Sequence, residues 1–155
     1  MASRAMADTE LLIERTFAAP ARLVFDMWAD RDHFMRWLGP VGFTCTEAEL
    51  DFREGGDWSA TMVSDQYGES RMAGRYLEIE PGRRIVMTFR WVHDASYPET
   101  VITLIFTEKD GRTVQLFHQT PFQDVASRDS HIGGWSEAFD REQAYAEAVA
   151  QESMP

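Results

Sequence analysis

The chain has 155 residues, of which 44% are hydrophobic, and its 26 acidic and 15 basic side chains give a formal net charge of −11. This length favours a single domain, and the negative charge argues against nucleic acid and anionic membrane surfaces as partners. The only cysteine, Cys45, excludes an internal disulfide.

No apolar run approaches the roughly 18 residues that a membrane-spanning helix needs, and the first residues contain no apolar signal core. We therefore expect a cytoplasmic protein. Residues 1–155 are expected to form one domain with a core from about 9 to 150, and flexible ends at 1–8 and 151–155.

The moderately apolar residues 11–17 predict a first strand. Pro20 stands where a helix would begin. The apolar side chains after it recur at helical spacing, and Asp30 is placed to cap a second short helix. The Gly-Pro pair within Leu38–Gly42 ends that second helix.

The hydrophobic period changes to two from Phe43, which predicts a series of strands. In the first of them, the acidic side chains of Glu47, Glu49 and Asp51 alternate with apolar ones, so we expect one solvated face and one dry face. Gly55-Gly56 interrupts the pattern as a bulge or bend, and further strands follow at 58–62 and 72–79.

A tight turn at Pro81-Gly82 predicts a hairpin between strand 72–79 and strand 85–91. If the loop of this hairpin has two residues, Tyr76 pairs with Met87. These two side chains then share one face of the sheet.

Asp110-Gly111 is a strong signal for a second hairpin, formed by residues 101–119. Counting outward from this turn pairs Ile105 with Leu116. Because alternate side chains point to the same face of a strand, we expect the inward face of its second strand to carry Val114, Leu116 and His118.

The last segment, from about Asp124 to Ala150, has apolar side chains at three- and four-residue steps and predicts a long helix. Gly133 and Gly134 each cost about 1 kcal/mol relative to alanine inside a helix. We therefore expect another part of the backbone, in the sheet or around Trp37, to approach the helix closely at these glycines.

Several blocks of the sequence, taken in order, resemble the SRPBCC superfamily, also described as START-like or Bet v 1-like. The resemblance is strongest to its branch homologous to the activator of the 90-kDa heat-shock protein's ATPase, and it covers about Leu11 to Ala148. The blocks are RTFAAPARLVFDMW, RWLGP, DFREGGDW, GRYLEIEPGRRIVMTFRW, the strand with Val114, Leu116 and His118, and HIGGW.

The resemblance implies an α+β helix-grip fold, in which a seven-stranded curved antiparallel sheet wraps around the long C-terminal helix and two short helices follow the first strand. Members of the superfamily bind hydrophobic or amphipathic small molecules between helix and sheet. We expect this function here, with no cofactor and no metal. One departure is Glu142, where the family usually has an apolar residue. We expect Glu142 to face solvent, because acidic side chains are seldom buried without a partner; a position near the pocket is the alternative.

The expected ligand site is an apolar chamber under the final helix, with Leu116 and Phe139 facing each other and methionines that adapt to different ligand shapes. The candidate polar anchors are Tyr76, His118 and Trp135, and His118 would orient a ligand carbonyl or hydroxyl group. The alternatives are a core histidine satisfied by its neighbours and an interior filled by side chains. The predicted lining consists of Trp37, Trp58, Met62, Tyr76, Met87, Phe89, Trp91, Leu116, His118, Trp135 and Phe139.

Two other functions stay open at this point. A co-chaperone-like module acting on a chaperone ATPase would need an exposed interaction surface, and a homodimer through a sheet edge is also compatible with the sequence. A cyclase- or hydrolase-type enzyme would need a histidine and a carboxylate that converge in the pocket. His131 stands one helical turn before Trp135, and we expect it to pack or hydrogen-bond onto the loop after Trp37.

Overall fold

The computed structural model describes residues 7–152, which form seven strands and three helices. Residues 1–6 and 153–155, part of the ends expected to be flexible, lie outside the described residues. The elements are, in chain order, β1 (Leu11–Phe17), α1 (Ala21–Ala29), α2 (Arg31–Trp37), β2 (Phe43–Leu50), β3 (Asp57–Ser64), β4 (Gly68–Glu80), β5 (Arg84–Trp91), β6 (Thr100–Lys109), β7 (Arg112–Thr120) and α3 (Val125–Glu152).

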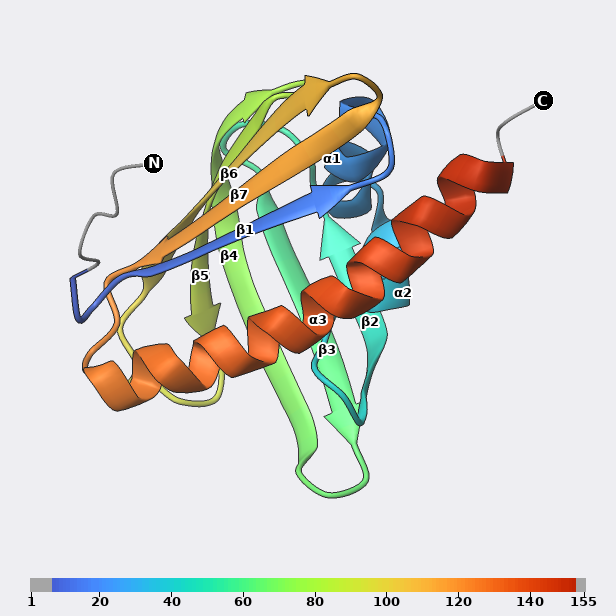
Figure 1. The fold of residues 1–155 in the computed structure, drawn as a ribbon. Helices are drawn as coiled ribbons and strands as arrows, with labels where there is room; N and C mark the ends of the chain where they lie inside the picture. Colours follow the sequence, from blue (N-terminus) through green and yellow to red (C-terminus); the bar gives the residue numbers. More distant parts are fainter. Residues whose placement is uncertain (1–6, 153–155) are drawn as a thin grey trace.

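The strands form one antiparallel sheet in the order β1-β7-β6-β5-β4-β3-β2. Both short helices follow β1, and α3 runs across one face of the curved sheet (Figure 1). The predicted helix-grip fold is therefore confirmed. None of the helices within residues 7–152 is long and apolar enough to cross a membrane.

The two short helices form as their sequence predicts. Asp30 caps α2, because its Oδ1 accepts hydrogen bonds from the backbone N–H groups of Asp32 at 2.8 Å and His33 at 3.3 Å. After the end of α2, Gly39 has a φ of 116°, which favours glycine because the left-handed region crowds a Cβ. This turn directs the chain back toward β2.

The turn between β6 and β7 is confirmed. Asp110 and Gly111 both have positive φ, 55° and 77°, as the tightest hairpins require. Ile105 accordingly pairs with Leu116.

The turn between β4 and β5 differs from the prediction in length. It holds three residues, because Glu80 pairs with Arg84. A β-bulge between Tyr76 and Glu78 takes up the extra residue. The predicted pairing of Tyr76 with Met87 is thereby restored.

The inward face of β7 is not the one expected. Its buried side chains are Thr113, Gln115, Phe117 and Gln119, whereas the predicted set of Val114, Leu116 and His118 lies on the opposite face and is partly exposed. Alternation divides a strand into two faces but does not say which one is inside, and the more apolar face was wrongly chosen. The ring of Phe117, not Leu116, meets Phe139, with centroids 5.1 Å apart.

The buried glutamines of β7 are each held by a tryptophan. Trp28 Nε1 donates to Gln115 Oε1 at 3.0 Å, and Trp135 Nε1 donates to Gln119 Oε1 at 2.8 Å. Gln119 Nε2 in turn donates to Thr100 Oγ1 at 2.9 Å. These bonds satisfy amide groups that are costly to bury alone, and they join α1 and α3 to the same strand.

Glu142 is fully buried, so its expected position facing solvent is wrong. Its Oε1 accepts a hydrogen bond from Gln115 Nε2 at 3.0 Å, and its Oε2 accepts one from Trp28 Nε1 at 3.2 Å. Burial raises the pKa of Glu142 to about 8, and the two hydrogen bonds and the charge of Arg15 oppose this rise only in part. The polar partners of Glu142 lie on α1 and on the buried face of β7, which the sequence did not predict to face inward.

The raised pKa of Glu142 predicts that this residue contributes stability that is lost as the pH rises. Between about 4.5 and about 8, the unfolded chain releases this proton and the folded chain keeps it. The Glu142 contribution to the free energy of unfolding therefore falls by up to about 1.4 kcal/mol per pH unit in this window. Glu142→Gln should remove this contribution, which urea unfolding across the same window measures.

The matched control for this experiment is Glu152→Gln, which neutralises an exposed glutamate of the same helix. It should follow the wild-type dependence on pH. If Glu142→Gln also follows the wild type, the carboxyl is not buried as described.

Candidate functional site

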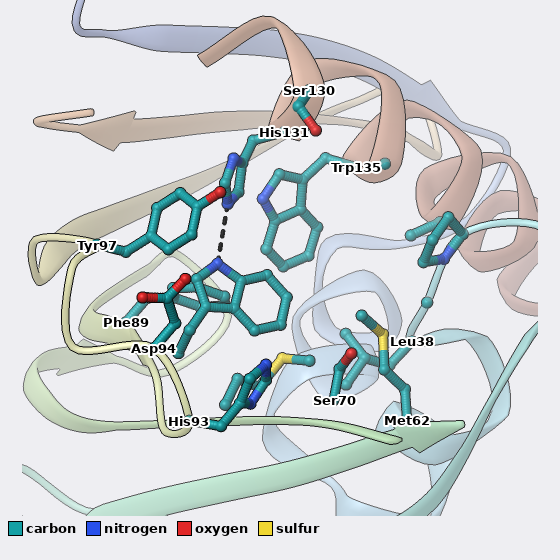
Figure 2. A pocket seen from close by; sticks show the side chains of 16 residues that line it. Leu38, Met62, Ser70, Phe89, His93, Asp94, Tyr97, Ser130, His131 and Trp135 are labelled. Atoms are coloured by element: carbon teal, nitrogen blue, oxygen red, sulfur yellow. Dashed lines mark hydrogen bonds between the residues drawn. The ribbon is translucent and has the colours of Figure 1, made fainter. Parts of the chain in front are cut away.

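A cavity of about 310 Å³ lies between the N-terminal half of α3 and the sheet. Strands β3, β4 and β5 form one wall and α3 forms another, and the α2–β2 turn and the β5–β6 loop complete the lining (Figure 2). Figure 1 shows why these parts meet, because the β5–β6 loop passes beside the first turns of α3.

The sheet contributes a mainly apolar wall. Side chains that point inward alternate along a strand, and the inward ones here are Met62 of β3, Ser70 and Met72 of β4, and Phe89 and Trp91 of β5. Met62 pairs with Ser70, and Met72 pairs with Trp91 on the neighbouring strand. Strand pairing therefore brings these residues together without any contribution from loops.

The helix contributes residues spaced three and four apart, which share one face of α3. They are Ser130, His131, Gly134, Trp135 and Ala138. The Trp135 ring packs on Phe117 with centroids 4.8 Å apart, and its indole N–H is held by Gln119. Trp135 thus anchors α3 to β7 and forms part of the cavity wall at the same time.

Both helix glycines lack the close backbone neighbour that the sequence led us to expect. A Cβ placed on Gly133 or Gly134 would meet nothing within 4 Å. Gly133 is exposed, whereas Gly134 lines the cavity. The missing side chain at Gly134 therefore leaves space in the cavity rather than room for another strand.

His131 fixes the orientation of Trp91 across the cavity (Figure 2). Trp91 Nε1 donates to His131 Nε2 at 3.1 Å, and His131 Nδ1 lies 2.7 Å from the Ser127 carbonyl oxygen. Because an indole N–H can only donate, Nε2 is the unprotonated acceptor and Nδ1 carries the proton. Burial lowers the pKa of His131, which favours this neutral form. The expected contact with the loop after Trp37 is not the one that forms.

The β5–β6 loop supplies a polar rim from His93, Asp94 and Tyr97. Hydrogen bonds from the backbone N–H and hydroxyl of Ser96 hold the pKa of Asp94 below its usual value. Asp94 is therefore a carboxylate at the cavity mouth at neutral pH.

Only part of the predicted lining surrounds this cavity. Met62, Phe89, Trp91 and Trp135 do line it. All four lie on the strands and helix whose periodicity the sequence shows.

Other predicted lining residues are packed in the core instead. The Trp37 indole donates to the Met27 carbonyl at 3.1 Å and the Trp58 indole donates to the Thr88 carbonyl at 2.9 Å. Burial also raises the pKa of Tyr76. The interior is therefore filled by side chains in one region and hollow in another. The core residues of this group are Trp37, Trp58, Tyr76, Met87 and Phe139.

Leu116 and His118 do not reach the cavity. They lie on the outer face of β7, where His118 Nε2 is 3.7 Å from Glu10 Oε2. The expectation that His118 points inward as a polar anchor is wrong, for the same reason that the face of β7 was misassigned.

The lining residues that the sequence did not indicate come from turns and loops and also from β4 and α3. Leu38, Gly39 and Pro40 were interpreted only as the end of a helix, and residues 93–97 only as a loop. Loop residues carry no periodicity, so their place in the lining follows from tertiary packing. The pair of helix glycines is a signal in the sequence, but at Gly134 it marks open space in the cavity and not a close backbone neighbour.

The enzyme hypothesis needs a histidine and a carboxylate that converge in the cavity, and the rim carries one such pair, His93 and Asp94. His118 is outside the cavity, Glu142 contacts Trp28 and Gln115, and both ring nitrogens of His131 have partners. Within residues 7–152, no group of three or more His, Cys, Asp or Glu side chains is placed to hold a metal ion.

Comparison with known proteins identifies the family. Residues 18–147 match the family model AHSA1, described as activator of Hsp90 ATPase homolog 1-like protein. The chain belongs to the AHSA1 family. The resemblance to the SRPBCC superfamily drawn from the sequence blocks is thereby confirmed.

Solved structures share the AHSA1 fold over nearly the whole chain. A protein of Chromobacterium violaceum is 26% identical, with a TM-score of 0.83, and the match covers 91% of this chain and 99% of that one. The AHSA1 protein of Silicibacter pomeroyi is 24% identical with a TM-score of 0.78, covering 92% and 99%. The AHSA1-like protein of Aeromonas hydrophila is 18% identical with a TM-score of 0.77, covering 94% and 97%. A search of curated proteins finds no match.

The hydrogen bond between His131 and Trp91 predicts a loss of stability in acid. Below pH 6.5, the unfolded chain takes up a proton at His131, whereas the folded chain resists it because its pKa is lowered. The His131 contribution to the free energy of unfolding should fall with decreasing pH by up to about 1.4 kcal/mol per pH unit until the folded pKa is passed, and it opposes the Glu142 contribution over the same range. His131→Gln keeps an acceptor for the indole without a titrating group, so below pH 6.5 its free energy of unfolding should rise relative to that of the wild type as the pH falls.

Urea unfolding between about pH 7 and about pH 5 measures the effect. The control is His93→Gln, an exposed histidine on the rim of the same cavity, which should retain the wild-type slope. If the free energy of unfolding of His131→Gln has the same pH slope as that of the wild type, His131 is not a neutral imidazole with a hydrogen bond at each ring nitrogen.

Proposed function

We propose that this AHSA1-family chain binds a hydrophobic or amphipathic small molecule in the cavity between α3 and the sheet. The observation that carries the proposal is the cavity of about 310 Å³ beneath a helix that has a glycine, Gly134, where a side chain would enter it. Sites for small molecules typically measure about 300–1,000 Å³ and combine apolar walls with a few polar groups.

The walls favour a ligand with an apolar body. Burial of apolar surface contributes about 25 cal/mol per Å², so covering about 200 Å² of a ligand would contribute about 5 kcal/mol before the costs of association. Met62 and Met72 face the cavity, and their flexible thioether side chains can adapt to the outline of a ligand.

The aromatic walls are held in place by hydrogen bonds to side chains on other elements. His131 of α3 accepts from Trp91 of β5, and Gln119 of β7 accepts from Trp135 of α3. Walls that are fixed before binding lose less entropy when a ligand enters. Membership of the SRPBCC superfamily supports the same proposal, because the helix-grip fold is consistent with a domain that forms a cavity for a ligand.

A leucine at position 134 tests the proposal directly. Gly134→Leu should fill the space under α3 and weaken binding of the neutral fluorescent probe N-phenyl-1-naphthylamine by at least about tenfold. Probe fluorescence during titration with the wild type and the variant measures this change. The variant should stay folded, since leucine is a better helix former than glycine by up to about 1 kcal/mol.

Gly133→Leu is the matched control, because Gly133 is the adjacent helix glycine, is exposed and also has open space around it. Its affinity for the probe should stay within about twofold of the wild type. Absence of probe binding to the wild type, or equal loss in both variants, would contradict binding in this cavity.

A further inference from the structure

We infer that the ligand of this cavity is a cationic amphiphile, an apolar ring system that carries a protonated amine, rather than a carboxylic acid. This inference rests on the proposed function. It follows from three features of the lining: the Asp94 carboxylate at the mouth, aromatic side chains near that carboxylate, and a lining that contains histidine but no lysine or arginine.

The carboxylate is that of Asp94. In the described part of the chain, the hydrogen bonds that reach it, from the backbone and hydroxyl of Ser96, both end on Oδ1. Oδ2 therefore remains available to a ligand. Figure 2 shows Asp94 beside Tyr97, among the side chains that surround the cavity. An ammonium group placed here would gain a charge-assisted hydrogen bond.

Aromatic side chains line the cavity next to this carboxylate. Trp91 and Tyr97 both belong to the lining. Tryptophan and tyrosine rings attract cations through their π faces. The hydrogen bond to His131 restricts the Trp91 indole to one orientation. A carboxylate with two aromatic neighbours, of which Trp91 is held in place, is a suitable environment for an ammonium group.

The arginine side chains near the cavity face elsewhere. On β4 and β5, Arg71 and Arg90 alternate with the inward residues and line hollows on the other face of the sheet. Arg141 approaches Gly39 of the lining, but its guanidinium donates to the carbonyl oxygens of Gly39, Pro40 and Phe43. A ligand carboxylate would therefore enter the cavity with no lysine or arginine in the lining to pair with and would meet Asp94 at its mouth.

The net charge of the chain acts in the same direction. The formal charge of −11 attracts cations and repels anions as they approach. This long-range effect weakens with added salt.

Three ligands with the same ring system separate the possibilities. They are 2-(1-naphthyl)ethylamine, 2-(1-naphthyl)ethanol and 1-naphthylacetic acid, which are cationic, neutral and anionic at neutral pH. Calorimetric titration should show that the amine binds about tenfold more tightly than the alcohol and that the acid binds most weakly. Gly134→Leu should weaken the binding of all three, which assigns them to this cavity.

Asp94→Asn should reduce the ratio of amine to alcohol affinity to about threefold or less. Asp65→Asn is the control, because it removes one negative charge from an exposed turn residue, and it should keep the wild-type ratio. A ratio that Asp94→Asn leaves unchanged overturns the inference, as does tightest binding by the acid or equal binding of all three ligands. These results leave the proposed function intact, whereas it fails if neither these ligands nor N-phenyl-1-naphthylamine binds.

Discussion

The anchorage of α3 on β7 is the constraint on which the rest of the molecule depends. Phe117 of β7 packs against both Trp135 and Phe139, with centroid separations of 4.8 Å and 5.1 Å, and Gln119 holds the Trp135 indole at 2.8 Å. These contacts fix the helix over one part of the sheet. The space under its N-terminal half, beside β3, β4 and β5, is left as the cavity.

The interface between α3 and the sheet carries polar groups that are close to uncharged at neutral pH. Burial favours protonated Glu142, whose pKa is raised to about 8, and neutral His131, whose pKa is lowered. A low-dielectric interface penalises both charged forms. The hydrogen bonds to Gln115, Trp28 and Trp91 satisfy these buried groups and give them defined orientations. The polar residues therefore help to specify the position of α3 on the sheet.

Much of the fold could be predicted because local signals agreed with each other. Asp110-Gly111 set the register of β6 against β7, and Asp30 marked the start of α2. The inward face of β7 could not be predicted in this way, since its outer face is the more apolar one. Gln115 and Gln119 are inside because Trp28 and Trp135 supply their hydrogen bonds, and those partners lie far away in the sequence.

The candidate site likewise has residues that the local sequence pattern predicts and residues that it does not. Met62, Phe89, Trp91 and Trp135 were predicted, because strand and helix periodicity places them under α3. The contributions of Gly39 and of the loop with Asp94 and Tyr97 depend on tertiary packing, which no local pattern encodes. Glu142 was misplaced because its burial requires partners on two other elements.

The five tryptophans allow the most direct test of a ligand cavity under α3. Nuclear magnetic resonance of the ¹⁵N-labelled protein would follow each indole N–H during titration with N-phenyl-1-naphthylamine. The account predicts that the signals of Trp91 and Trp135, which line the cavity, shift most. Shifts confined to Trp28, Trp37 and Trp58, or unchanged signals from all five at saturating probe, would contradict it.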